Sequence, residues 1–219
     1  MSAAGGAGQV AVRGTAAEVS PFKLASVLLQ YPTAALFAGL DHLDAVAAAT
    51  APRAARQAFG RFLAWLRATP PDQVAQHYVA TFDLRRRCCP YLTYYSHGDT
   101  RRRGVALLQF TAAYRAAGFE LAGGELPDHL AVVCEFAAAE PGRGRALFRR
   151  HRAGVELLRT ALADAGAPWL HVVDAVRAVL PEAAPRDLRR AMHLARAGPP
   201  AEEVGLEPFA PPEYMGGRR

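Results

Sequence analysis

The sequence predicts an all-α protein. Apolar residues recur at helical spacing along most of the chain, most clearly at Phe59, Phe62, Leu63 and Leu66. No alternating run rich in Val, Ile or Thr competes with this pattern, and Ile is absent. Pro and Gly residues separate the periodic segments. We therefore expect a bundle of about seven to nine helices joined by short loops.

The 219 residues suit one domain with loose ends. Residues 1–19 are rich in Ala and Gly and lack bulky apolar periodicity, so we expect a disordered lead. Residues 20–197 carry the helical pattern and form the expected domain. Residues 198–219 hold five prolines and are expected to be a disordered tail.

Four helices are expected before residue 83. The first opens at Ser20-Pro21, because a hydroxyl caps free amides and Pro suits the first helical position. The second runs from Thr33 into the Ala-rich stretch before Pro52. The third carries the Phe59 to Leu66 stripe, and the fourth begins with Asp72 as its N-cap.

Residues 83–99 fit no period, so we expect an irregular segment. Asp99 or Thr100 then caps a helix to Arg115, whose two apolar faces predict a central, buried position. A further helix begins at Pro127, with Asp128 in its first turn. Three more are expected: one from residue 141 to 165, one from 168, and one from 185 with Leu188 and Met192 on its inner face.

Net charge and cysteine content limit the possible partners and the cellular compartment. The formal charge of +6 permits attraction to nucleic acid, acidic membranes or acidic proteins. The three cysteines are an odd number and two are adjacent, which favours a reducing compartment. Residues 1–19 lack the apolar core of a secretory signal, and no apolar run is long enough to cross a bilayer. We expect a cytoplasmic protein without stable membrane association.

Catalytic signatures are missing from the sequence. The seven His form no HxxxH or HExxH pair, and the adjacent Cys88 and Cys89 have no second cysteine pair to complete a metal site. There is no GxSxG, SxxK, Walker A loop or GxGxxG motif. We therefore expect a protein that is not an enzyme and holds no metal.

The segment from residue 77 to 104 contains most of the side chains that could bind a partner. It contains four of the seven tyrosines and two Arg triplets, Arg85 to Arg87 and Arg101 to Arg103. Cations beside aromatic rings are typical of single-stranded nucleic-acid binding. Tyr and Arg are also the residues enriched at peptide-binding hot spots between helices. We prefer the peptide groove and keep nucleic-acid binding as the alternative.

Several motifs resemble one family. They are Tyr78–Asp83, Tyr91–Gly104, Tyr114–Phe119 and the Glu-Leu-Pro-Asp-His-Leu box of residues 125–130, and with Leu28–Pro32 they span roughly residues 20–195. Together they resemble the NarJ-type assembly chaperones of respiratory nitrate reductase, within the TorD/DmsD class of redox-enzyme maturation proteins. The resemblance implies a TorD-like all-α fold.

The resemblance also implies a function. Members are cytoplasmic, non-catalytic chaperones that bind the N-terminal segment of the nitrate reductase catalytic subunit. They hold it soluble while molybdopterin guanine dinucleotide is inserted, before membrane docking, and keep no cofactor themselves. Molybdenum cofactor biosynthesis proteins are further candidate partners.

A set of client-contact residues follows as a hypothesis. Tyr91, Tyr94 and Tyr95 are expected to line an apolar floor, and Arg101 and Arg103 to pair with client carboxylates or carbonyls. Asp99 and Asp128 would cap helices or meet client cations, and His97 and His129 would make affinity sensitive to pH near neutrality. The full set is Tyr78, Phe82, Tyr91, Leu92, Tyr94, Tyr95, His97, Asp99, Arg101, Arg103, Asp128 and His129.

Overall fold

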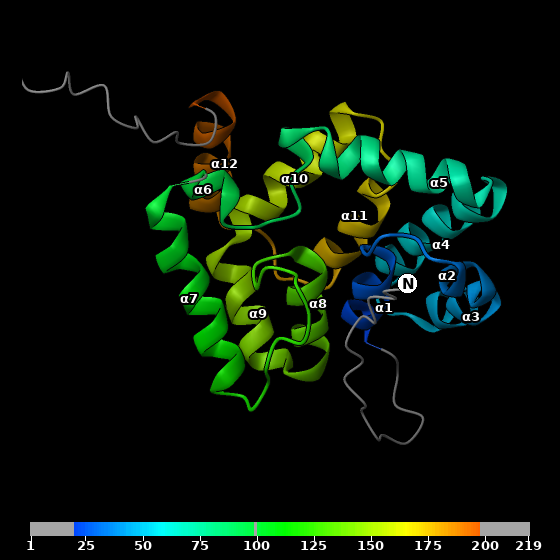
Figure 1. Cartoon of the computed structure of the whole chain (residues 1–219), viewed down its shortest axis with the longest axis horizontal. Helices are drawn as coiled ribbons and strands as arrows, with labels where there is room; N and C mark the ends of the chain where they lie inside the picture. The colour runs from blue at the N-terminus through cyan, green and yellow to red at the C-terminus, as the bar shows by residue number, and fades with distance from the viewer. Residues whose placement is uncertain (1–19, 99, 198–219) are drawn as a thin grey trace, which may run out of the picture.

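The computed structural model describes residues 20–98 and 100–197, and most of these residues are helical (Figure 1). The only extended pairing in these two ranges is an isolated antiparallel bridge between Tyr91 and His129. The predicted all-α class is therefore confirmed. The predicted lead and tail, 1–19 and 198–219, lie outside the described residues, and the division into three parts remains a prediction.

The first part of the chain has five α-helices where four were predicted. The helix expected from Thr33 is two helices, because Gly39 ends one and begins the next. Pro70, not Asp72, is the N-cap of the following predicted helix, and Asp72 lies in its first turn. The bounds are α1 Pro21–Leu28, α2 Ala34–Ala38, α3 Leu40–Ala49, α4 Arg53–Ala68 and α5 Pro71–Tyr78.

The second part contains shorter elements than expected. A π-helical turn, Val79–Asp83, leads into the segment predicted to be irregular, which holds a 3-10 turn, Arg86–Cys88, and a four-residue helix. The helix expected over 141–165 is interrupted at His151. The bounds are α6 Tyr94–His97, α7 Arg101–Arg115, α8 Leu130–Ala139, α9 Pro141–Arg150, α10 Arg152–Asp164, α11 Leu170–Ala178 and α12 Pro185–Ala197.

The described residues thus form twelve α-helices, above the predicted range, because two expected helices are split and α6 was not expected. In Figure 1, α2 to α5 lie on one side of the molecule and α6 to α9 with α12 on the other. Helices α1, α10 and α11 join the two sides: α11 packs against α4, α1 and α10, and α1 also packs against α8. The chain therefore crosses between the sides more than once.

A cluster of aromatic rings, here called the Trp169 cluster, fills the interior between α4, α5 and α11. The Trp169 ring lies 5.3 to 5.7 Å, centroid to centroid, from four other rings, and its indole Nε1–H donates to the Leu28 carbonyl at 3.1 Å. That bond satisfies a carbonyl at the end of α1. The cluster consists of Phe62, Trp65, Tyr78, Phe82 and Trp169.

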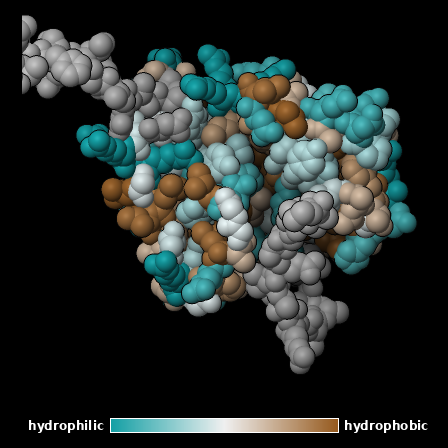
Figure 2. All heavy atoms as spheres, in the orientation of Figure 1, coloured by the Kyte–Doolittle hydropathy of each residue, from teal (hydrophilic) through white to brown (hydrophobic). Residues whose placement is uncertain are grey.

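Helix α7 does not occupy the central position predicted for it. Its Val105 and Leu108 side chains are 64% and 68% exposed, whereas Phe110 and Tyr114 are buried. Figure 2 shows an apolar surface over α7, which lies at the edge of the molecule in Figure 1. One of the two apolar faces has no covering element among the described residues, so the prediction was wrong.

The last helix also differs from its prediction. Leu188 and Met192 of α12 are exposed, and Ala191 is the buried residue that faces the bundle. Helix α12 packs against α10. Within the described residues, no helix combines the length and apolar character needed to cross a membrane.

Candidate functional site

The Tyr91 to His97 segment is tied to the start of α8 by backbone hydrogen bonds. The Leu92 N–H donates to the Asp128 carbonyl at 3.1 Å, and the Leu130 N–H donates to the Pro90 carbonyl at 2.9 Å. These bonds form the bridge between Tyr91 and His129. Two of the motifs singled out in the sequence are therefore in direct contact.

Asp128 is the centre of this junction and is completely buried. Its Oδ2 accepts from the Thr93 backbone N–H at 3.0 Å and from the Thr93 hydroxyl at 2.6 Å. The Arg103 Nη2 lies 4.0 Å from its Oδ1, with the Arg103 side chain 15% exposed. A buried carboxylate is tolerable only with such partners, so these contacts explain its position.

The helix-capping roles expected for Asp128 need a correction. Helix α8 begins at Leu130, so Asp128 lies before it and not in its first turn. Thr93, which donates to the carboxylate, is the N-cap residue of α6. Asp128 therefore stabilises the start of a helix about 35 residues away in sequence.

Arg103 lies among aromatic rings as well as beside Asp128. Its guanidinium carbon is 5.3 Å from the Tyr91 ring centroid and 5.9 Å from the Tyr94 ring centroid. A guanidinium at this distance is attracted by the ring face. Arg103 thus bridges a buried anion and two tyrosines. We call Tyr91, Thr93, Tyr94, Arg103, Asp128 and His129 the Asp128 cluster.

Tyr91 is the half-buried edge of the cluster. Its hydroxyl donates to Glu125 Oε1 at 2.7 Å, and its ring meets the His129 ring edge-on at 5.2 Å. The same Glu125 oxygen accepts from the Leu126 N–H at 3.0 Å. Burial and the Glu125 carboxylate raise the pKa of Tyr91, so its hydroxyl stays a donor.

His129 has a structural task that the sequence did not reveal. It is the N-cap of α8, and its Nδ1 accepts from the Ala131 N–H at 3.2 Å. This bond requires an unprotonated Nδ1. Burial lowers the pKa of His129, and burial followed by Arg190 and Arg102 lowers the pKa of His97. Both imidazoles therefore favour the neutral form, which counts against the predicted titration near neutrality.

Leu92 and Tyr95 support the segment from inside. Leu92 is buried, and α10 approaches its backbone so closely that a Cβ on Gly154 would lie 2.7 Å from the Leu92 carbonyl oxygen. The Tyr95 hydroxyl is 2.8 Å from the Arg87 carbonyl and 2.9 Å from the Cys89 carbonyl. These two predicted contact residues hold the segment in place.

Tyr78 and Phe82 belong to a different part of the molecule. Both lie in the Trp169 cluster, and the Tyr78 hydroxyl donates to the Leu29 carbonyl at 3.2 Å. Both side chains are buried. Of the remaining predicted residues, His97 is half-buried on α6, Arg101 is exposed, and Asp99 lies outside the described residues.

Sequence reasoning missed two participants. Glu125 holds Tyr91, and Thr93 holds Asp128, although neither was in the predicted set. Thr93 carries no local signal for this role, since its hydroxyl makes no cap bond to α6 and donates instead to Asp128, which is distant in sequence. Glu125 carries none beyond its place in the Glu-Leu-Pro-Asp-His box.

The fold and this site define a class of protein: a helical bundle in which a buried carboxylate, surrounded by aromatic rings, has a structural role. The described residues contain no group of three or more His, Cys, Asp or Glu side chains placed to hold a metal. The family model for the nitrate reductase delta subunit matches residues 47–174, which include the whole Asp128 cluster. The chain belongs to this family, as the resemblance predicted.

Curated relatives agree with the family. The chain is 41% identical over 160 residues to the nitrate reductase-like protein NarX of Mycobacterium tuberculosis, covering 71% of this chain and 23% of NarX. It is 33% identical over 142 residues to the probable nitrate reductase molybdenum cofactor assembly chaperone NarJ of Bacillus subtilis, covering 64% of this chain and 77% of that protein.

A third relative is the nitrate reductase molybdenum cofactor assembly chaperone NarJ of Escherichia coli. It is 35% identical over 120 residues, which cover 54% of this chain and 51% of that protein. The chain thus spans less than a quarter of NarX and about half of the E. coli protein.

Proposed function

We propose that this protein is a non-catalytic assembly chaperone for a nitrate reductase. It binds the N-terminal segment of the catalytic subunit in the cytoplasm and keeps that subunit soluble while molybdopterin guanine dinucleotide is inserted. It holds no cofactor of its own and releases the subunit before membrane docking. The observation that carries the proposal is the family match over residues 47–174, supported by two relatives named as molybdenum cofactor assembly chaperones.

The client surface that we propose is the exposed edge of the Asp128 cluster. Tyr91 and Leu126 both bond to the same Glu125 oxygen, and Leu126 is 37% exposed. They offer an apolar surface beside a carboxylate. Aliphatic client side chains would pack on Tyr91 and Leu126, and a client cation would meet Glu125. Arg101, which is exposed nearby in the chain, would pair with client carboxylates.

The buried residues of the predicted set have a supporting part in this proposal. Leu92, Tyr95, Asp128 and His129 fix the backbone on which Tyr91 stands. Because the surface is preformed, binding costs little ordering of the chaperone. A client that must be released calls for roughly −8 to −10 kcal/mol of binding free energy, or micromolar to tens of nanomolar affinity.

The nucleic-acid alternative is less well supported. A single-strand binder needs exposed rings on which bases stack. Tyr94 and Tyr95 are buried, and Arg103 is turned inward toward Asp128.

Titration calorimetry tests the proposal. The full chain is titrated with a synthetic N-terminal peptide of the host's nitrate reductase catalytic subunit, and in parallel with a single-stranded oligonucleotide. We expect saturable peptide binding with a negative heat-capacity change. Tyr91→Ala should weaken it about tenfold or more, as for a central anchor. Tyr31→Ala is the matched control, since Tyr31 is a 52% exposed tyrosine that contacts Tyr78 in the other part of the molecule.

Circular dichroism of both variants checks that the helices are intact. No peptide binding, together with steeply salt-dependent oligonucleotide binding, would contradict the chaperone proposal. Equal weakening by both substitutions would contradict the placement of the client at Tyr91.

A further inference from the structure

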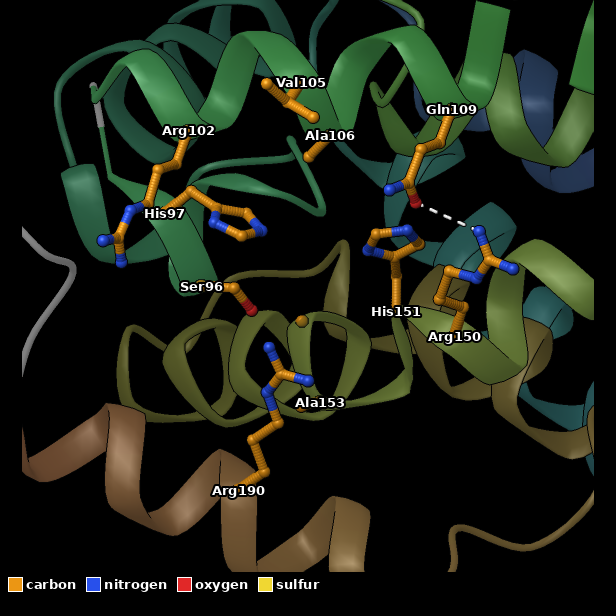
Figure 3. A pocket seen from close by; sticks show the side chains of 11 residues that line it. Ser96, His97, Arg102, Val105, Ala106, Gln109, Arg150, His151, Ala153 and Arg190 are labelled. Atoms are coloured by element: carbon orange, nitrogen blue, oxygen red, sulfur yellow. Dashed lines mark hydrogen bonds between the residues drawn. The ribbon is translucent and has the colours of Figure 1, made fainter. Parts of the chain in front are cut away.

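A second site candidate lies beneath α7, at a cavity that the proposed client surface does not use. The cavity has a volume of about 360 Å³ and is bounded by α6, α7, α9, α10 and α12 (Figure 3). This volume lies in the usual range for small-molecule sites. Its lining residues are Ser96, His97, Arg102, Val105, Ala106, Gln109, Arg150, His151, Ala153, Gly154 and Arg190.

The cavity concentrates positive charge from three helices. Arg102 comes from α7, Arg150 from the end of α9 and Arg190 from α12. Among the described residues, the lining contains no Asp or Glu. Within residues 20–98 and 100–197, none of these three guanidinium groups lies within ion-pair distance of a carboxylate.

Some arginines of the protein are paired with carboxylates, whereas exposed ones such as Arg53, Arg61 and Arg143 lie outside ion-pair distance of any carboxylate among the described residues, as the three cavity arginines do. Arg67, Arg152, Arg159 and Arg177 each contact at least one carboxylate at 3.0 Å or less. Arg150 instead donates to the neutral Gln109 side chain at 3.0 Å, from across the cavity (Figure 3). The part of the lining that the structure describes therefore supplies no carboxylate to neutralise these three arginines.

Two imidazoles face the same space. In Figure 3 the His97 and His151 rings and the Arg190 guanidinium point toward one another across the cavity. The His151 ring is held 4.6 Å from the Phe110 ring, and its buried Nε2 has no hydrogen-bond partner in the described part of the chain. A buried polar atom without a partner is uncommon and calls for a ligand or a water.

The electrostatic effect on the imidazoles agrees with this geometry. Burial lowers the pKa of His151 to about 4, and Arg150, His97 and Arg190 add to the effect. The neutral imidazole keeps one N–H donor without adding further charge repulsion. The described walls thus present hydrogen-bond donors on several sides and no carboxylate among them.

We propose that this cavity binds a small organic phosphate, with the phosphate groups held between Arg102 and Arg190 and against the His151 ring. Guanidinium groups bind phosphate oxygens in pairs, and a phosphate accepts more hydrogen bonds than a carboxylate. Three arginines match two phosphate groups better than one. The aliphatic wall formed by Val105, Ala106 and Ala153 would contact the organic part.

Calorimetry with inorganic pyrophosphate and with adenosine diphosphate, each at constant ionic strength, tests the proposal. We expect saturable binding of both, weakened about tenfold by Arg102→Gln or Arg190→Gln, as expected for loss of a charge-assisted pair. Arg189→Gln is the matched control, because Arg189 is an exposed neighbour on α12 that does not line the cavity. His151→Gln should also weaken binding.

The two probes separate the sources of affinity. Tighter binding of adenosine diphosphate than of pyrophosphate supports an organic ligand. Equal affinity would show that the cavity recognises the phosphate groups alone, and would overturn the organic assignment. Equal weakening by Arg189→Gln and Arg190→Gln, or absence of binding, overturns the site. Displacement of pyrophosphate by the client peptide would assign the cavity to the client instead. Binding of the two probes is measured without the client, so its absence would leave the proposed chaperone function untouched.

Discussion

The two aromatic clusters of this protein use the same residue types for different ends. In the Trp169 cluster, rings pack on rings, and the Trp169 and Tyr78 polar atoms reach backbone carbonyls at the end of α1. In the Asp128 cluster, rings surround a charged pair, Arg103 with Asp128, and one ring reaches the surface at Tyr91. The first arrangement depends on packing and the second on buried charge. Aromatic residues alone therefore do not mark the functional surface.

The largest effect is expected from the packed cluster. Trp169→Ala removes the ring shared by four others and should lower the free energy of unfolding by about 4 kcal/mol. Trp169→Phe keeps most of the packing but loses the bond to the Leu28 carbonyl, and should cost about 1 to 2 kcal/mol. Urea unfolding followed by circular dichroism measures both. Peptide affinity of the folded Trp169→Phe variant should not change; a loss would show that the clusters are not separate in function.

In the Asp128 cluster, a substitution that changes the side chain less should lower the free energy of unfolding nearly as much. Asp128→Asn keeps the shape but removes the charge opposite Arg103, at a cost of about 3 kcal/mol. Glu182→Gln, at an exposed carboxylate, is the control and should cost less than about 0.5 kcal/mol. Denaturant titration compares the two. If Asp128→Asn unfolds no more easily than the control, the contrast between packing and buried charge fails.

A backbone contact gives a sharper test of how the charged cluster is supported. Gly154→Ala places a Cβ 2.7 Å from the Leu92 carbonyl oxygen and should destabilise the protein by about 2 kcal/mol. Gly104→Ala, within α7, meets nothing within 4 Å and should stabilise it by up to about 1 kcal/mol. Melting temperatures should therefore move in opposite directions. Movement in the same direction would show that α10 does not pack against Leu92 as described.

The smallest effect is a change in the pH dependence of stability, which arises on the side of the molecule that contains α7. His151 has a pKa of about 4 in the folded protein, whereas an imidazole titrates near 6.5 when unfolded. Between these values the unfolded state holds more protons, so the free energy of unfolding falls as pH falls. From pH 7 to pH 5 we expect His151 to account for about 1 to 2 kcal/mol of that loss.

The measurement is urea unfolding of the wild type and of His151→Gln at several pH values. The variant should lose stability less steeply on acidification because it lacks the imidazole. Parallel curves for the two proteins would mean that His151 is solvated in the folded state, and that the cavity under α7 does not impose its charge on the ring.

Local patterns in the sequence were enough to predict the core. The stripe that begins at Phe59 is buried as expected, because it repeats at helical spacing over several turns. The motif residues were also found together, since Tyr91 and Asp128 belong to one cluster. Periodicity and motif spacing thus located both the scaffold and the region of the candidate site.

The sequence did not predict contacts that depend on distant partners. Thr93 and Asp128 are 35 residues apart, and no local pattern shows that one caps the helix of the other. The exposure of Val105 and Leu108 escaped prediction because an apolar face is the same in sequence whether or not another helix covers it. The split at His151, whose ring packs on Phe110 of another helix, likewise has no signal in the local pattern.

The bridge at Tyr91 and His129 has a consequence for how the protein opens. It closes the stretch of chain containing α6 and α7 into a loop whose ends meet at one point. We therefore expect α7 to detach as a unit, and its amide hydrogens to exchange with solvent through that local opening. The Leu92 and Leu130 amides, which hold the loop closed, should exchange only when the whole protein unfolds. Entry to the cavity under α7 would then follow the rate of this motion.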